Sequence, residues 1–217
     1  IKHVPLVRNV DDLWPEVLFD LGIKKQSVLK EIGEVSANLT YNLASAITPI
    51  SKAYVPVINQ KYGVNNKKIF IVPAGVDFSM FSNQTYHSKS TDNRQFTVLY
   101  IGALSPAYDF DQVLRAARWL TKTDVKIVIQ GGGELAEPVR TKIKKSGLAN
   151  VVLINKIVDR AEVAQILQSA DALLLPLNGA GSIELGISSK LYEYQAAGKP
   201  ILCCSNGQSG RYVSQTR

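Results

Sequence analysis

Short runs of apolar residues alternate with amphipathic segments over the second half of the chain. The runs have the length of strands, and the segments between them place apolar residues at helical spacing. We expect strands at 96–101, 125–129, 151–154, 172–177 and 201–204, and helices at 110–120, at 135–145, after a cap at Asp159, and at 190–197. Continuously apolar strands are buried on both faces, so the pattern predicts a doubly wound, parallel, Rossmann-like α/β domain.

The first part of the chain has a similar but shorter pattern. We expect strands at 4–7, 46–50 and 69–72, helices at 26–43 and 52–62, and a linker in the polar stretch 82–94. These elements are fewer than a closed three-layer domain uses, and no helix is expected after the fifth strand of the second half. We therefore expect residues to be missing from one or both ends.

Composition and charge narrow the class of protein. The 217 residues carry a formal net charge of +7, but the basic residues, such as Lys24 and Lys25, are scattered, and no nucleic-acid motif accompanies them. No apolar run approaches the ~18 residues of a membrane span, and no signal peptide is evident. Two adjacent cysteines, Cys203 and Cys204, are poorly placed to bridge each other, which favours a reducing compartment.

Candidate chemistry gathers where ligands of such sheets bind, beyond the carboxyl ends of the strands. Ser189 and Lys190 are expected at the start of a helix. The free backbone N–H groups there and the charge of the lysine favour a bound phosphate; an ordinary helix cap is the alternative. Glu193, one turn later, can accept two ribose hydroxyl hydrogen bonds, or is a plain surface glutamate. The glycines 131–133 allow a ligand to approach the backbone, but also punctuate loops.

Five segments in this order resemble one family. They are 71–77 (IVPAGVD) with Phe81, 100–104 (YIGAL), 129–133 (IQGGG), 169–176 (SADALLLP) and 189–201 (SKLYEYQAAGKPI), and 6–16 (LVRNVDDLWPE) fits as well. The chain resembles the retaining glycosyltransferases of family 4, which are glycosyl transferases group 1 of GT-B architecture. It is most similar to members that build lipid-linked or surface glycans.

The resemblance implies an acceptor-side domain at 1–81, here partial, the linker 82–94 and a nucleotide-sugar domain at 95–217. It implies transfer of a hexose or acetamidohexose from a nucleotide sugar, with UDP favoured, and with retention of configuration. The nucleotide sugar is a substrate, so no cofactor is expected, and no metal. Expected donor-binding residues are Gly102, Ala103, Gly132, Ser189, Lys190, Leu191 and Glu193.

Three positions depart from the family pattern. The family's first glutamate falls on Leu185, although a one-residue loop shift would bring Glu184 there. Its two basic residues fall on Ala103 and Tyr108, which leaves Lys190 as the best candidate to neutralise the leaving diphosphate. Its active-site histidine falls on Asp11. Expected catalytic residues are Asp11, Asp12, Lys190 and Glu184.

Other interpretations stay open. The chain is compatible with another sugar-nucleotide enzyme on the same scaffold, and with a catalytically inactive module that only binds a nucleotide. The resemblance and the charge together indicate a glycan or lipid-linked acceptor and a cytoplasmic location, with peripheral contact at the inner face of the membrane. Asp109 and Asp111 match a D-x-D motif in letters, but open a helix.

Overall fold

The computed structural model describes residues 4–22, 28–82 and 95–216. The chain forms two compact units. Unit 1 contains the described residues of Ile1–Ala74 together with Gly179–Ser188 and Ser205–Arg217, and unit 2 contains those of Gly75–Asn178 and Ser189–Cys204. Each unit is described by itself below.

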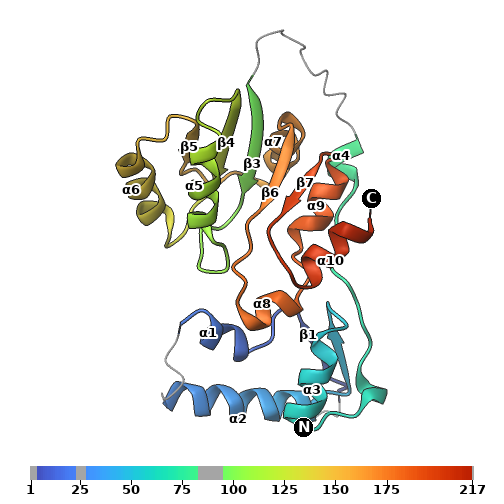
Figure 1. The fold of residues 1–217 in the computed structure, drawn as a ribbon. Coiled ribbons are helices and arrows are strands. Elements are labelled where there is room, and N and C mark those ends of the chain that lie inside the picture. Colours follow the sequence, from blue (N-terminus) through green and yellow to red (C-terminus); the bar gives the residue numbers. More distant parts are fainter. Residues whose placement is uncertain (1–3, 23–27, 83–94, 217) are drawn as a thin grey trace. The chain divides into compact units, whose positions relative to one another are not determined.

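Unit 2 is built on a five-stranded parallel sheet with the order β5-β4-β3-β6-β7 (Figure 1). The strands are β3 (Phe96–Ile101), β4 (Val125–Gln130), β5 (Val151–Ile154), β6 (Ala172–Leu175) and β7 (Ile201–Cys203). Numbered within the unit, this order is 3-2-1-4-5, the order of the Rossmann fold. The predicted fold class is confirmed.

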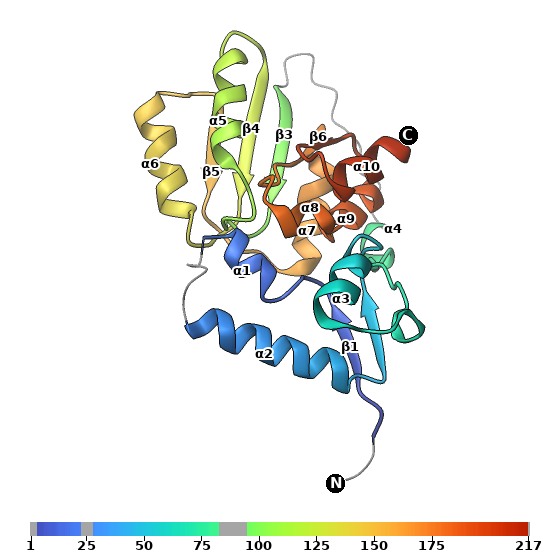
Figure 2. The same ribbon diagram turned by 60° about the horizontal axis from the view of Figure 1, so that its bottom comes forward.

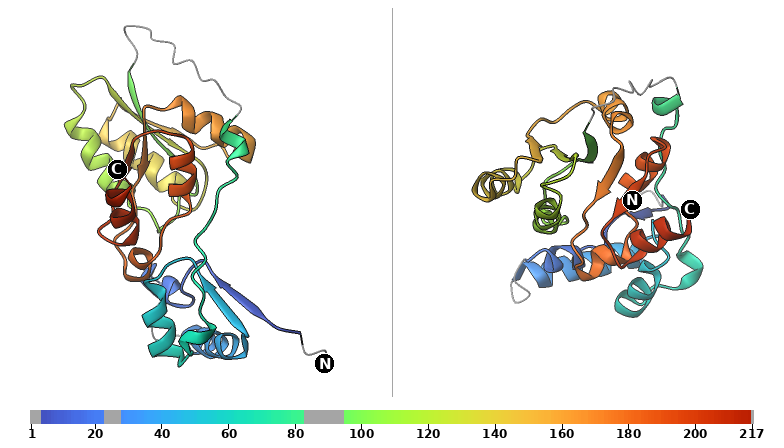
Figure 3. Two further views of the ribbon diagram at one scale, coloured as in Figure 1. Left: turned by 90° about the vertical axis from the view of Figure 1, so that its right-hand side faces the viewer. Right: turned by 45° about the horizontal axis from the view of Figure 1, so that its top comes forward.

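Helices cover both faces of this sheet. They are α5 (Phe110–Trp119), α6 (Ala136–Ser146), α7 (Arg160–Ser169) and α9 (Lys190–Ala196), while α4 (Ser79–Ser82) is a single turn. Helices α5 and α6 lie on one face and α7 on the other (Figure 3, right). All four residues of β6 are buried, as a strand between two helical layers requires.

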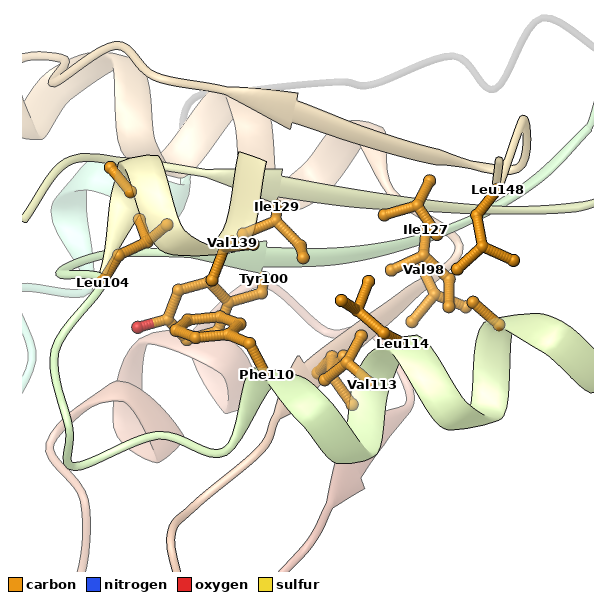
Figure 4. Packing of buried hydrophobic residues seen from close by; sticks show 14 of the residues in the cluster. Val98, Tyr100, Leu104, Phe110, Val113, Leu114, Ile127, Ile129, Val139 and Leu148 are labelled. Atoms are coloured by element: carbon orange, nitrogen blue, oxygen red, sulfur yellow. The ribbon is translucent and has the colours of Figure 1, made fainter. Parts of the chain in front are cut away.

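The main core of unit 2 lies between the sheet and α5 with α6 (Figure 4). Tyr100 and Ile129 are paired across β3 and β4 and are completely buried. The ring of Tyr100 packs edge-on against Phe110, with the ring centroids 5.2 Å apart. Because α5 contributes Phe110, Val113, Leu114 and Ala117 to this core, its apolar positions fall on one face, as the sequence predicts.

Unit 1 contains a parallel pair of strands, β1 (Val7–Val10) and β2 (Ala46–Pro49). Its helical elements are α1 (Glu16–Asp20), α2 (Val28–Leu43), α3 (Tyr54–Tyr62), the 3-10 turn η1 (Asn66–Lys68), α8 (Gly181–Leu185) and α10 (Gln208–Gln215). Helices α2 and α3 pack with the two strands around a second core (Figure 2), in which the rings of Tyr41 and Tyr62 stack.

Several predicted elements differ from the structure. The first strand covers 7–10 rather than 4–7, because residues 4–6 continue without a ladder partner. The expected strand at 69–72 is reduced to one isolated bridge, from Ile47 to Ile69. A helix that was not expected, α8, forms between β6 and α9, and α10 follows β7, so the expectation of no later helix is wrong. Lys24, Lys25 and most of the predicted linker lie outside the described residues.

Within the described ranges, no helix combines the length and the apolar character that crossing a bilayer requires.

Candidate functional site

The centre of the sheet in unit 2 is its topological switch point. From the neighbouring strands β3 and β6 the chain continues to opposite faces of the sheet, and ligands of such sheets bind beyond the carboxyl ends of these strands. Two backbone hydrogen bonds join the loops there: Asp109 N–H donates to Pro176 C=O over 2.8 Å, and Asn178 N–H donates to Ala107 C=O over 2.9 Å. The loops that follow β3 and β6 thus form one connected rim.

Gly102, directly after β3, is in close contact with Lys190, the first residue of α9. The φ angle of Gly102 is +144°, and a Cβ atom built there would lie 2.7 Å from Lys190 Cε and would overlap with Nζ. Only a glycine leaves room for the lysine in this position. The structure therefore brings together two residues that are 88 positions apart and that were both predicted as donor-binding.

Two tyrosine rings flank the ammonium group of Lys190. Its Nζ lies 5.9 Å from the ring centroid of Tyr100 and 5.9 Å from that of Tyr108. Burial lowers the pKa of Lys190 and outweighs the opposing influence of Glu193. Among the described residues, no carboxylate lies within ion-pair distance of this ammonium group. The result is a partly desolvated cation with aromatic neighbours, which suits an anionic ligand.

Glu193, also on α9, is partly buried and lies 3.7 Å from the guanidinium of Arg160, measured from Oε1 to Nη2. Arg160 is the first residue of α7, which follows β5. Because β5 and β6 are parallel, α7 and α9 both begin at the carboxyl edge of the sheet. A glutamate and an arginine, besides Lys190, are thus held at the edge where ligands of this fold bind.

The other predicted donor-binding residues have different environments. Ala103 is exposed, and its carbonyl oxygen accepts a 2.5 Å hydrogen bond from the Tyr100 hydroxyl. Ser189 is exposed and precedes α9, but its side chain does not cap the helix. Leu191 is fully buried, so only its backbone is available to a ligand. Gly132 is partly buried beside Ile157 and Asn155.

The glycines that flank Gly132 have a packing role that the sequence did not reveal. A Cβ atom on Gly131 would overlap with the carbonyl oxygen of Gly102, and one on Gly133 would lie 2.5 Å from the carbonyl oxygen of Leu104. The N–H of Leu104 donates to Gly132 C=O over 2.8 Å. Glycines at 131 and 133 let two backbone segments pass each other closely.

The remaining predicted catalytic residues belong to unit 1. Asp11 and Asp12 follow β1, and Asp11 accepts a 2.8 Å hydrogen bond from Asn9. Partial desolvation, and then the negative charge of Asp11, raise the pKa of Asp12. Glu184 lies on α8, where its Oε1 accepts a 3.0 Å hydrogen bond from the Ser205 hydroxyl, while the neighbouring Leu185 packs against the core.

Both aspartates of the D-x-D sequence interact with other residues of unit 2. Asp109 caps α5 by accepting a hydrogen bond from the N–H of Gln112, and Asp111 pairs with Lys142 at 2.7 Å. In the described part of the chain, no three His, Cys, Asp or Glu side chains gather as metal ligands. Among the described residues, neither Cys203 nor Cys204 forms a disulfide bond.

Arg160 and the two tyrosines are the site residues that the sequence analysis missed. Arg160 follows Asp159, which was considered only as a helix cap. Its position in the first turn after β5 is a usable signal, since every such turn reaches the carboxyl edge. The contribution of Tyr100 depends on its ring lying beside a lysine that is far away in sequence, and no local pattern indicates that.

Solved structures share this fold, among them the following three. Anabaena HepE in complex with UDP and glucose superposes with a TM-score of 0.67 at 16% identity, over 96% of this chain and 55% of HepE. WaaG, described as a glycosyltransferase involved in lipopolysaccharide biosynthesis, has a TM-score of 0.73 at 14% identity, over 96% and 59%. Sucrose-phosphate synthase from Thermosynechococcus elongatus has a TM-score of 0.70 at 14% identity, over 91% and 49%. The chain therefore spans about half of their length.

No curated protein matches the sequence significantly. The sequence profile of the family described as glycosyl transferases group 1 matches residues 82–216, which is more than half of the chain. This match covers β3 to β7 and includes Gly102, Lys190, Glu193 and Arg160. The chain belongs to the family glycosyl transferases group 1.

Proposed function

We propose that unit 2 binds the nucleotide-sugar donor of a glycosyltransferase, with a UDP sugar as the favoured donor. The observation that carries this proposal is the contact of Lys190 with Gly102 at the switch point of the sheet. In the proposed complex the diphosphate lies against Gly102 and the ammonium group of Lys190. Ser189, Ala103, Leu191 and Gly132 offer polar or backbone contacts around it.

Glu193 is the proposed partner of the ribose. A carboxylate can accept hydrogen bonds from both ribose hydroxyls, and Glu193 is one helical turn from Lys190. This spacing matches a nucleoside diphosphate, in which the ribose directly follows the phosphates. The presence of UDP in the HepE complex supports UDP as the first ligand to test.

The proposed reaction transfers a hexose or acetamidohexose to a glycan or lipid-linked acceptor with retention, as in family 4. The bond between the sugar and the diphosphate breaks and its electron pair leaves with the diphosphate. An acceptor hydroxyl forms the new bond on the same face of the sugar and gives its proton to the departing diphosphate. Lys190 would stabilise the charge that develops on the leaving diphosphate. We assign no cofactor, since the nucleotide sugar is a substrate, and no metal ion.

Roles for the unit 1 carboxylates belong to the same proposal. Asp11 and Asp12 are proposed to face the acceptor, and Glu184 the donor sugar. Asp12 is the stronger candidate for proton exchange, because its raised pKa brings it closer to neutral pH. The variants Asp12→Asn and Glu184→Gln test these two roles separately.

The decisive experiment has two stages. Saturation-transfer NMR with UDP, UDP sugars and GDP sugars tests donor binding, and Lys190→Met is expected to weaken the affinity for the ligands that bind. A transfer and hydrolysis assay with the bound donors, in the presence and absence of a chelator, then tests the reaction. Binding without turnover would instead support the nucleotide-binding module, and release of a modified sugar nucleotide would support another enzyme on this scaffold.

Contact with an anionic membrane surface is a further part of the proposal. A groove of about 370 Å³ between α5 and α6 is lined by Arg115, Arg118, Lys142 and Lys145 and by one acid, Asp111. Four cations and one anion suit phosphate headgroups, and each basic residue near such a surface contributes about 1 kcal/mol.

Vesicle co-sedimentation tests this membrane contact. The double change Arg118→Glu and Lys145→Glu is expected to release the protein from phosphatidylglycerol vesicles. The charge-matched pair Lys52→Glu and Lys67→Glu, on exposed residues of unit 1, serves as the control. Equal binding to phosphatidylcholine vesicles would refute a contact based on charge.

A further inference from the structure

Lys190 has a potential counter-ion in its own helix. Glu193 is three residues further along α9, and at this spacing the two side chains lie on the same side of a helix. Glu193 is near enough to influence the charge on Lys190. An ion pair between them would neutralise the ammonium group that the proposed donor site needs. In the described part of the chain, the ion pair of Glu193 is with Arg160 instead, at 3.7 Å.

Arg160 is well suited to attract this carboxylate. Its side chain is 66% exposed, and it has no ion pair other than Glu193 among the described residues. Its charge also reaches Asp77, whose pKa is lowered mainly by hydrogen bonds from Ser79 and to a smaller extent by Arg160. The guanidinium thus provides a second positive centre beside α9, at a different position from the one that Lys190 occupies.

We propose that Arg160 is a positioning residue that holds the Glu193 carboxylate away from Lys190. In this arrangement Lys190 stays available to the diphosphate and Glu193 to the ribose. The inference rests on the donor site proposed above, and it assigns no contact between Arg160 and the ligand. Without Arg160, Glu193 is expected to turn toward Lys190 and to compete with the phosphates for its charge.

Inorganic pyrophosphate is the suitable probe, because it contains two linked, negatively charged phosphates but no ribose for Glu193 to bind. Calorimetric titration of the whole chain would compare wild type, Arg160→Ala, Glu193→Gln and the double variant. Arg160→Ala is expected to weaken pyrophosphate binding about twofold to fivefold, the range of couplings between partly exposed charges. The double variant should regain most of this loss, since the competing carboxylate is gone.

Arg140→Ala is the matched control. Arg140 forms an exposed ion pair with Glu137 on α6, so its removal also deletes one charge from an exposed arginine–glutamate pair. Pyrophosphate affinity should remain unchanged in this variant. A second readout is the ¹³Cε signal of Lys190, whose pKa should rise in Arg160→Ala and fall again in the double variant.

Each possible result is decisive. Weakening in Arg160→Ala with recovery in the double variant supports the inference. Weakening without recovery means that Arg160 itself binds the phosphates, and this overturns the positioning role, as does an unchanged affinity in Arg160→Ala. If wild type binds neither pyrophosphate nor UDP, the proposed donor site itself is refuted. If wild type binds pyrophosphate and Arg160→Ala binds it equally well, only the positioning role of Arg160 is refuted.

Discussion

The ammonium group of Lys190 lies over the backbone of Gly102, in the space that a side chain at position 102 would fill. This contact joins the loop after β3 to the start of α9 at the switch point of the sheet. The contact explains why the residue that follows β3, with a φ angle of +144°, is a glycine.

Gly102→Ala is expected to remove nucleotide binding with only a moderate loss of stability. The new Cβ would displace the flexible end of Lys190 rather than backbone, so the main effect falls on the ligand. Gly147→Ala is the matched control, because Gly147 has a φ angle of +63° but no atom within 4 Å of a Cβ. Both changes should lower stability through backbone strain, by about 1–2 kcal/mol at Gly147 and about 1–3 kcal/mol at Gly102, measured by thermal unfolding, and only the change at Gly102 should abolish UDP binding.

Lys190→Met should weaken UDP binding and stabilise the free protein at neutral pH. Hydrogen bonds to a charged group contribute about 1.5–3 kcal/mol, so we expect the affinity to fall about 10- to 100-fold. Burial lowers the pKa of Lys190 in the folded state, so the unfolded state binds the proton more tightly.

The pH dependence of that variant follows from the same shift. The stability of wild type should rise with pH from the lowered native pKa of Lys190 up to its ordinary value of 10.5. The stability advantage of Lys190→Met should therefore be largest below the native pKa and should shrink as the pH approaches 10.5. Urea unfolding at several pH values measures this; an advantage that grows with pH would contradict the assignment.

Asp12→Asn is expected to make the protein more stable at pH 7. Desolvation and the charge of Asp11 raise the native pKa of Asp12 above 3.8, so the folded state binds this proton more tightly than the unfolded state. Stability should therefore fall as the pH rises from 3.8 through the native pKa, and the variant avoids that loss. The gain should vanish below pH 3.8, and Asp124→Asn controls for the change in net charge.

Tyr108→Leu tests the aromatic surroundings of Lys190. A cation over a tyrosine ring gains about 0.5–1 kcal/mol at exposed sites, so the loss of the ring should weaken UDP binding about twofold to fivefold. Tyr108→Phe keeps the ring and should lose less than Tyr108→Leu. Equal losses in both variants, measured by calorimetry, would assign the effect to the hydroxyl instead.

The sequence by itself determined the repeating architecture of unit 2. The apolar run 96–101 coincides with β3, because a strand buried on both faces leaves a local signature, and the run 151–154 coincides with the edge strand β5. It also placed Gly102, Lys190 and Glu193 at the carboxyl edge, since parallel strands direct all their carboxyl ends to one side. The family motifs are local too, and they were readable for the same reason.

Tertiary structure decided how those residues meet. The contact of Lys190 with Gly102, the two tyrosine rings and the ion pair from Glu193 to Arg160 each join segments that are far apart in sequence. The helix α8 and the lost strand at 69–72 depended on tertiary packing, which overrides local propensity in short segments. Periodicity indicates which face of an element is buried, but not which distant side chain packs against that face. The site depends on contacts between distant side chains.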